Sequence, residues 1–305
     1  MSGLDEFKQG IIIRYKEVGR KWLDQLPHLV NQCAQKWSLT DLEPVDDLTY
    51  NYVLSGFQGA NHIILKLRCS VYDRVLIQRE VDALQATQQY RAVTLLAYDQ
   101  DLGALLLQKI IPGTTLAGMI LSDDKQATQC AVKLLQQLHT VPLVSDAKFS
   151  CLNDVIPHFE YNFAILAPFT SKARHLRELL LKNEPYTHVV LLHGDFHHGN
   201  ILLGASHTYY AIDPEGMIGD PGYDMAVFIR NPLTTLITMP HIKEIIINRI
   251  KIFSDYFGYD AKRVCQWVYL QAFTSAYWSL EDGEKVDRHG AFLTCMETIL
   301  EEYTQ

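Results

Sequence analysis

The chain has 305 residues, of which 48% are hydrophobic, and a formal net charge of −8. This length and hydrophobic content allow a large buried core, in one large domain or two moderate ones. The negative charge argues against nucleic acid as a partner, because its phosphates need a basic surface, and favours a cationic small molecule.

The sequence shows neither a membrane segment nor a disulfide framework. Its first residues, Met1 to Glu6, have no basic start leading into an apolar core. No stretch approaches the roughly 20 apolar residues that cross a bilayer. The six cysteines lie far apart without a C-x-x-C pair, which favours reduced thiols. We therefore expect a cytoplasmic protein with no membrane partner.

The first predicted elements are helices followed by a β-hairpin. Apolar residues have helical spacing from about Asp5 to Trp37, and we expect Pro27 to start or kink a second helix. β-Type residues then run from Leu48 to Leu54 and from Ile63 to Leu67. These two runs predict a hairpin whose loop extends from Ser55 to Asn61.

Two glycines in this loop, Gly56 and Gly59, are candidates for contacts with a nucleotide. Their backbone N–H groups could come close to phosphates. Taken alone the signal is weak, because the spacing is not that of G-x-G-x-x-G, and an ordinary hairpin turn explains it equally well.

A lysine and a glutamate stand out in the next part of the chain. Lys66 lies inside an apolar strand, where a cation is costly unless it is paired, and Glu80 lies in the helical run Val75 to Leu84. Strand-like runs from Ala92 to Tyr98 and from Gly103 to Lys109 complete a predicted five-stranded sheet.

The rest of the chain is predicted to be mostly helical. The segment Ile110 to Gly113 breaks the strand pattern, and the runs Ala127 to His139 and Leu152 to Leu181 are amphipathic. Tyr223 to Ala226 opens a further helix, in which Asp224 either caps the N-terminus or bonds to the loop described next.

The most informative stretch runs from Leu191 to Asn200, with the sequence LLHGDFHHGN, and is followed by Ile212-Asp213-Pro214-Glu215-Gly216. The pattern predicts a strand, a polar loop, a short hairpin and a second acid. A carboxylate at Asp195 can orient an acceptor hydroxyl and take its proton. Oxygens of Asn200 and Asp213 suit Mg²⁺. The spacing therefore predicts a site for phosphoryl transfer from ATP.

The histidines of this loop allow a second interpretation. His193, His197 and His198 could bind zinc, but a spacing of four places ligands on one face only in a helix. The loop glycines and the lack of a nearby cysteine pair disfavour zinc, and we expect His197 and His198 to be solvated.

These motifs resemble those of the kinase superfamily and, within it, the aminoglycoside phosphotransferase family, in which H-G-D-x-x-x-x-N replaces the catalytic loop of protein kinases. The segments AIDPEG, GDPGYDMA and RNP, beginning at Ala211, Gly219 and Arg230, are most similar to the streptomycin 6-kinase and hydroxyurea kinase subfamily. The resemblance extends from about Tyr52 to the C-terminus.

The resemblance implies an α+β, two-lobed fold like that of protein kinases. The N-terminal lobe, residues 1–110, would hold a five-stranded antiparallel sheet with helices, and the C-terminal lobe, residues 111–305, would be mainly helical. His193 would brace the catalytic loop. Lys66 would contact the phosphates and pair with Glu80. Backbone groups of Gln108, Lys109 and Ile110 would contact the adenine, with the bonding residue among the three left open.

The resemblance also implies an acceptor site beside C-terminal helices. The candidates there are Trp278, Glu281 and Asp282, which combine an aromatic ring with acids and suit a cationic guanidinium or amine. A solvated helix over core aromatics explains the same pattern.

We therefore expect an ATP- and Mg²⁺-dependent phosphotransferase that acts on a hydroxyl of a small polar molecule, with an aminoglycoside such as streptomycin as the first candidate. The alternatives are a kinase of the choline, homoserine, methylthioribose or fructosamine type, and a nucleotide-binding regulator without turnover. A protein kinase is disfavoured, because Gly194 replaces the arginine of H-R-D and no A-P-E follows Asp213.

Overall fold

The computed structural model describes residues 3–46, 48–143, 149–182, 189–283 and 285–303. Two compact units divide the chain: residues 1–88 with 92–111 form unit 1, and residues 89–91 with 112–305 form unit 2. Among the described residues, no helix is long and apolar enough to cross a membrane.

Unit 1 begins with α1 (Gly3–Trp37), which is bent at Lys16 (φ 52°). Pro27 does not start a second helix, because it lies inside α1, and the residue with non-helical backbone angles is Lys16. Gly19 explains the position of the bend, because a Cβ there would lie 2.6 Å from the carbonyl oxygen of Ile11. The two halves of α1 can approach this closely only at a glycine.

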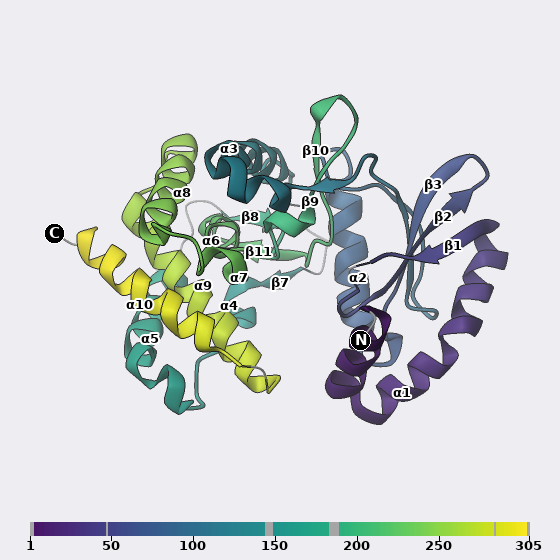
Figure 1. The fold of residues 1–305 in the computed structure, drawn as a ribbon, viewed down its shortest axis with the longest axis horizontal. Coiled ribbons are helices and arrows are strands. Elements are labelled where there is room, and N and C mark those ends of the chain that lie inside the picture. Colours follow the sequence, from purple (N-terminus) through teal and green to yellow (C-terminus); the bar gives the residue numbers. More distant parts are fainter. Residues whose placement is uncertain (1–2, 47, 144–148, 183–188, 284, 304–305) are drawn as a thin grey trace. The chain divides into compact units, whose positions relative to one another are not determined.

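The sheet of unit 1 has five antiparallel strands in the order β1-β2-β3-β5-β4, which confirms the predicted strand number (Figure 1). The strands are β1 (Leu39–Pro44), β2 (Tyr52–Gln58), β3 (Asn61–Leu67), β4 (Leu95–Asp99) and β5 (Ala104–Gln108). The apolar side chains of α1 and of the sheet share one buried core. Strand β1 was not identified from the sequence, because it is a largely exposed edge strand without an apolar run.

The hairpin of β2 and β3 is tighter than predicted. Gln58 pairs with Asn61, which leaves Gly59 (φ 60°) and one further residue in the turn. Gly56 therefore lies inside β2 and not in the loop. A Cβ at Gly56 would lie 2.7 Å from the carbonyl oxygen of Thr40 in β1, so strand packing accounts for this glycine.

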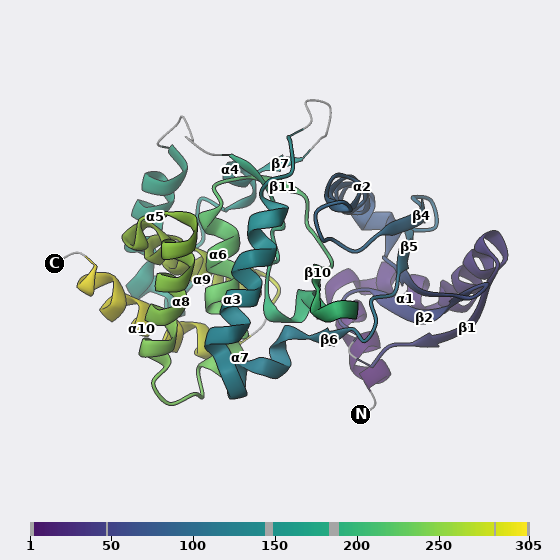
Figure 2. The same cartoon turned by 90° about the horizontal axis from the view of Figure 1, so that it is seen from above.

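Helix α2 (Ser70–Thr87) follows β3 and carries Glu80. Unit 2 is mainly helical, with α3 and α8 side by side (Figures 1 and 2). Its helices are α3 (Ile120–Leu138), α4 (Leu152–Val155), α5 (Ala167–Lys182), α6 (Gly222–Arg230), α7 (Leu233–Leu236), α8 (Ile242–Phe257), α9 (Ala261–Glu281) and α10 (Asp287–Glu302), with the short 3-10 helices η1 (Leu116–Met119) and η2 (Ala164–Leu166).

The predicted helical run from Leu152 to Leu181 is interrupted. Residues 157–163 are not helical, and they pack aromatic rings against α9 instead, where Phe159 meets Phe273 at 4.8 Å between ring centroids. The amphipathic pattern therefore reflected two helices and an intervening buried loop.

Two small sheets of unit 2 carry the motifs. The strands β8 (Val190–Leu192), β11 (Met217–Gly219) and β7 (Ser150–Cys151) form one sheet, and β9 (Ile201–Leu203), β10 (Tyr209–Ala211) and β6 (Thr114–Thr115) form the other. The 3-10 helices η3 (His198–Asn200) and η4 (Ala205–His207) flank β9. The H-G-D loop follows β8, and Asp213 follows β10.

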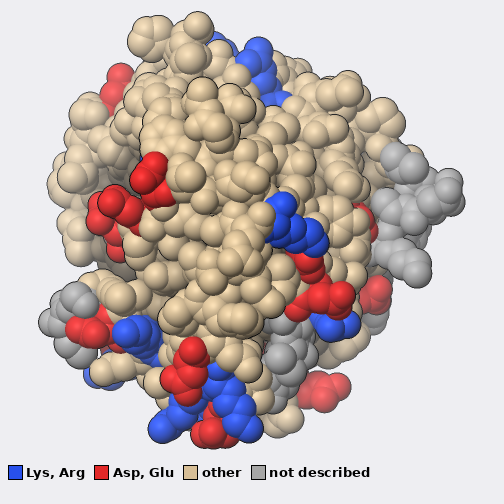
Figure 3. Space-filling model, turned by 90° about the vertical axis from the view of Figure 1, so that its right-hand side faces the viewer, with Lys and Arg blue, Asp and Glu red and all other residues tan. Residues whose placement is uncertain are grey.

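Acidic and basic residues do not form separate patches on the face shown in Figure 3. Among the described residues there, acidic and basic side chains are interspersed, and most of the face is uncharged. This face has no extended basic surface of the kind that nucleic acid requires.

Candidate active site

The loop after β8 turns sharply at Gly194, which has a φ of 86°. A Cβ at this position would lie 2.8 Å from the Cβ of Glu215 and 2.9 Å from the Cε of Met217. Both the positive φ and the close approach require glycine. The turn places Asp195 at the end of the apolar strand.

Asp224 of α6 anchors this loop through hydrogen bonds. Its carboxylate accepts the backbone N–H groups of His193 and Gly194, each at 2.8 Å, and faces Nε2 of His139 at 2.9 Å. Of the two roles considered for Asp224, the structure shows the bond to the loop. The buried carboxylate satisfies three donors, which fixes the loop backbone.

His193 braces the loop from inside, as predicted. Its Nε2 lies 2.9 Å from the carbonyl oxygen of Ile212, so this nitrogen carries the proton. Its Nδ1 accepts the N–H of Asp195 at 3.3 Å. Burial lowers the pKa of His193, which keeps the ring neutral and its tautomer fixed.

Asn200 and Asp195 are joined by two hydrogen bonds. The Nδ2 of Asn200 donates to the backbone oxygen and to Oδ2 of Asp195, both at 3.0 Å. Because both partners are acceptors, the orientation of the amide is unambiguous. The side-chain oxygen of Asn200 therefore points away from Asp195 and is suited to a cation.

The environment of Asp195 favours its ionised form. Burial alone would raise its pKa, but the hydrogen bond from His197 and the charge of Arg230 hold the pKa below its usual value. Protein surrounds the carboxylate on several sides, yet 45% of its side-chain surface remains accessible. A charged, reachable carboxylate can accept a proton from a hydroxyl.

The two remaining loop histidines differ from each other. His197 accepts the N–H of Gly199 at its Nδ1, so Nε2 carries the proton and faces Asp195 at 3.4 Å. His198 was expected to be solvated, and this was wrong. It is fully buried and stacked on Phe228 at 3.9 Å between ring centroids. Burial and the charge of Arg249 lower its pKa well below the usual value.

Asp213 lies two residues beyond β10 and has a φ of 60°, which is unusual for a residue other than glycine. The N–H of Ile212 donates to the backbone oxygen of Asn200 at 2.9 Å. The hairpin of β9 and β10 therefore brings the two predicted metal ligands to neighbouring backbone positions. Among the described residues, no three His, Cys, Asp or Glu side chains form a metal site of their own.

Within unit 1, Nζ of Lys66 lies 2.7 Å from Oε1 of Glu80, and both side chains are almost fully buried. This is the predicted strand-to-helix ion pair. Arg68 approaches the other oxygen of Glu80 at 3.6 Å. A buried pair of this kind fixes the direction of Lys66.

Of the three predicted adenine-contacting residues, one has an unused backbone donor among the described residues. The N–H of Gln108 donates to Thr94 at 2.9 Å, and that of Lys109 donates to His62 at 3.1 Å. Within the described residues, the N–H of Ile110 has no such partner.

The predicted acceptor residues lie at the end of α9. Trp278 is half-buried, and Glu281 and Asp282 are exposed. Burial and the charge of Asp282 raise the pKa of Glu281. Most other aromatic residues of α9 belong to the core, including Trp267 and Tyr269.

Residues that the sequence did not single out as site residues interact electrostatically with Asp195 or with each other. Arg230 at the end of α6 donates through Nε to Oε1 of Gln271 on α9, and its charge interacts with that of Asp195. His289 of α10 lies close enough to Arg230 for the arginine charge to lower its pKa, and its Nε2 is 3.4 Å from Oγ of Ser275. The motif R-N-P contained Arg230, but nothing in its spacing indicated this contact.

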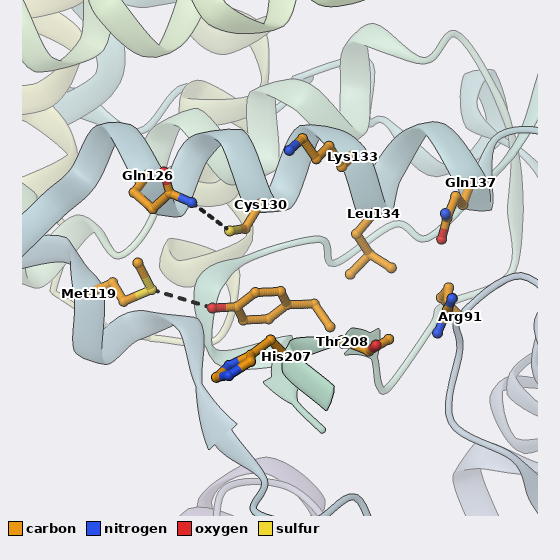
Figure 4. A pocket seen from close by; sticks show the side chains of 10 residues that line it. Arg91, Met119, Gln126, Cys130, Lys133, Leu134, Gln137, His207 and Thr208 are labelled. Carbon is orange, nitrogen blue, oxygen red and sulfur yellow. Dashed lines mark hydrogen bonds between the residues drawn. The ribbon is translucent and has the colours of Figure 1, made fainter. Parts of the chain in front are cut away.

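A separate pocket of about 450 Å³ opens between α3 and the turn of β9 and β10 (Figure 4). Its lining includes none of the predicted site residues. The charged side chains in it are Arg91 and Lys133, and Tyr209 donates to the sulfur of Met119 at 3.5 Å.

Known proteins resemble the chain in both sequence and fold. It is 26% identical to the streptomycin 6-kinase of Streptomyces glaucescens, over 88% of each chain. It is 27% identical to the hydroxyurea phosphotransferase of Kitasatospora aureofaciens, over 87% of this chain and 76% of that protein.

Solved structures share the fold. The aminoglycoside phosphotransferase APH(4)-Ia, in complex with ADP and hygromycin B, matches with a TM-score of 0.64 at 16% identity, over 89% of this chain and 97% of that one. Choline kinase LicA of Streptococcus pneumoniae gives 0.63 at 15% identity, over 92% and 99%. The fold is therefore kinase-like, as predicted.

The family model described as aminoglycoside/hydroxyurea antibiotic resistance kinase matches residues 54–283, which contain the H-G-D loop, Asp213 and all of α9. The chain thus belongs to the aminoglycoside/hydroxyurea antibiotic resistance kinase family and is a phosphotransferase.

Proposed function

We propose that the chain transfers the γ-phosphoryl group of Mg-ATP to a hydroxyl of a small polar molecule, with streptomycin as the first acceptor to test. The observation that carries this proposal is the pair of hydrogen bonds from Asn200 to Asp195. It presents an ionised carboxylate to solvent and directs an amide oxygen away from it. Relatives named streptomycin 6-kinase support the choice of acceptor.

In the proposed reaction Asp195 orients the acceptor hydroxyl and takes its proton. The hydroxyl oxygen bonds to the γ-phosphorus, the bond to the bridging oxygen breaks, and ADP leaves with its electrons. Asp195 needs no unusual proton affinity for this role, because in a loose transition state the hydroxyl proton moves late. Its lowered pKa keeps it ready as a base at neutral pH.

Asn200 and Asp213 fit Mg²⁺ as ligands. This hard cation takes oxygen ligands and is usually held by one or two carboxylates together with substrate phosphates. One amide oxygen and one carboxylate form such a set. Bound Mg²⁺ would neutralise the charge of the phosphates.

Unit 1 would contribute the nucleotide contacts. Lys66, aimed by Glu80, would bind the phosphates. The amide of Ile110 would donate to the adenine, because those of Gln108 and Lys109 are already used. Gly59 would approach the phosphates at the hairpin turn. Gly56 is the weaker candidate, since it is inside β2.

A product assay tests the proposal. The protein is incubated with Mg-ATP and a panel of streptomycin, other aminoglycosides, hydroxyurea and amino alcohols, and phosphorylated products are identified by mass spectrometry. We expect one phosphoryl group per acceptor and an equal amount of ADP. Absence of any phosphorylated acceptor across the panel would refute these acceptor classes.

A further inference from the structure

Arg230 has donors that its protein partners do not use. A guanidinium has five N–H donors, and the structure uses the one on Nε, which bonds to Gln271. In the described part of the chain, the two terminal nitrogens have no hydrogen-bond partner. Although Arg230 is only 9% exposed, these nitrogens are not fully enclosed. They are therefore accessible to a ligand.

This arginine remains charged at neutral pH. Burial lowers its pKa to about 10, against the opposing charges of Asp195 and Tyr223. A cation that is nearly buried and has unused donors costs free energy unless a partner satisfies them. The partner that fits is an oxygen atom, which accepts hydrogen bonds and is neutral or negative.

The other side chains around Arg230 carry little charge. Burial and the nearby arginine lower the pKa of His289 to about 4, so its ring is neutral at pH 7. Among the described residues its buried Nδ1 has no partner, and its Nε2 faces Ser275. Gln271 and Ser275 are neutral. Asp195 is the carboxylate whose charge acts on Arg230.

Helix α9 extends from the contact of Gln271 with Arg230 to the predicted acceptor residues. Gln271, Ser275, Trp278 and Asp282 are spaced by four, three and four residues, so they follow one face of the helix. This face is buried at Gln271 and exposed at Asp282, about 16 Å further along at 1.5 Å per residue. Glu281 lies roughly 80° from it at about 100° per residue.

We propose that Arg230 determines acceptor specificity by donating from its terminal nitrogens to an oxygen of the acceptor beside the hydroxyl that is phosphorylated. Gln271 holds the guanidinium in place. This inference rests on the proposed function. It divides the acceptor site into an inner end that selects oxygen and an outer end, toward Asp282, that can receive a cationic group.

Two small acceptors of nearly equal shape test the inner end. Hydroxyurea carries a carbonyl oxygen next to its N-hydroxyl group, and N-hydroxyguanidine carries a nitrogen group in its place. We compare them as acceptors, or as competitive inhibitors of streptomycin phosphorylation, with the wild-type protein and Arg230→Gln. Arg230→Gln should reduce the preference for hydroxyurea by about 10- to 100-fold, the range expected for a charged hydrogen bond, while KM for ATP stays unchanged.

Three further variants separate binding from folding. Arg20→Gln removes the same charge from an exposed position on α1 and should keep the wild-type preference. Arg230→Lys should retain part of it. Arg230→Ala should regain hydroxyurea affinity when guanidinium chloride is added at non-denaturing concentration. A purely structural role of Arg230 would not predict this rescue.

The outcomes distinguish this inference from the function on which it rests. If the wild-type protein phosphorylates an acceptor but Arg230→Gln leaves the ratio of the two affinities unchanged, the specificity role is refuted and the function stands. If Arg230→Gln lowers kcat equally for all acceptors without changing KM, Arg230 acts on Asp195 instead. If no acceptor is phosphorylated or bound, both proposals fail.

Discussion

Asp224 accepts the backbone N–H of Gly194 at 2.8 Å and thereby fixes the residue that precedes Asp195. The same carboxylate accepts the N–H of His193. An amide side chain cannot reproduce this, because one of its two groups is a donor that would face a donor.

Asp224→Asn should therefore lower kcat and destabilise the fold. Leaving a buried N–H unsatisfied costs about 1 to 3 kcal/mol. Denaturant unfolding measures the loss in free energy, and initial rates measure kcat. A variant with wild-type stability and rate would show that the loop holds its shape without Asp224.

The ion pair of Lys66 and Glu80 gives a second prediction. Glu80→Ala leaves Lys66 as a buried charge without its main partner, which costs about 3 to 5 kcal/mol when one member of a buried pair is removed. KM for ATP should rise as well, because Lys66 loses its direction. Glu80→Gln, which keeps a hydrogen-bond acceptor, serves as the control and should be milder. Equal stability of wild type and Glu80→Ala would contradict the structural role.

Asp213→Asn should weaken the binding of Mg-ATP, because it removes a full negative charge from a site for a hard cation. The Mg²⁺ concentration needed for half-maximal activity should rise. Calorimetric titration of Mg-ATP at low and high Mg²⁺ provides the measurement. Equal affinities for both proteins at both concentrations would remove Asp213 from the metal site.

At the outer end of the proposed acceptor site, we predict that substitutions of the neighbouring acids Asp282 and Glu281 have different effects on acceptor binding. Asp282 continues the face of α9 that starts at Gln271, whereas Glu281 lies off it. Asp282→Asn should raise KM for a cationic acceptor that spans about 16 Å and should not affect hydroxyurea, which is too short. Glu281→Gln is the matched control. A larger effect of Glu281→Gln would reverse this assignment.

The lowered pKa of Asp195 has a consequence for pH dependence. Its base form is the unprotonated one, so activity is present above the pKa and is lost as pH falls through it. The groups that lower this pKa are His197, through its hydrogen bond, and Arg230, through its charge. The profile of kcat/KM should therefore show no acid limb from Asp195 down to about pH 5, since an ordinary aspartate titrates near 3.9. A limb near neutrality that disappears in Asp195→Asn would contradict this.

Local spacing in the sequence predicted the strands and the loop that carry the candidate site residues. The positions of Asp195, Asn200 and Asp213 follow from strands and a short hairpin, whose patterns depend on nearby residues. The pairing of Lys66 with Glu80 followed from a charge in an apolar strand and from the family resemblance.

Features that depend on distant contacts were missed. The bend at Lys16 depends on the approach of Gly19 to Ile11, and the placement of Gly56 depends on packing against β1. His198 looked like a loop residue, because Phe228, which covers it, lies 30 residues away in the sequence. The contact of Arg230 on α6 with Gln271 on α9 joins two residues that are 41 positions apart in the sequence.

The most direct test of the proposed role of Asp195 compares wild type with Asp195→Ala. Both proteins are given streptomycin and Mg-ATP, and the phosphorylated product is quantified. We predict stoichiometric formation of phosphorylated acceptor and ADP by the wild type. In Asp195→Ala the rate should fall by about 10²- to 10⁴-fold, the usual contribution of a positioned base, with nearly unchanged ATP affinity. Equal turnover by the purified variant, with wild-type contamination excluded, would contradict the central role of Asp195.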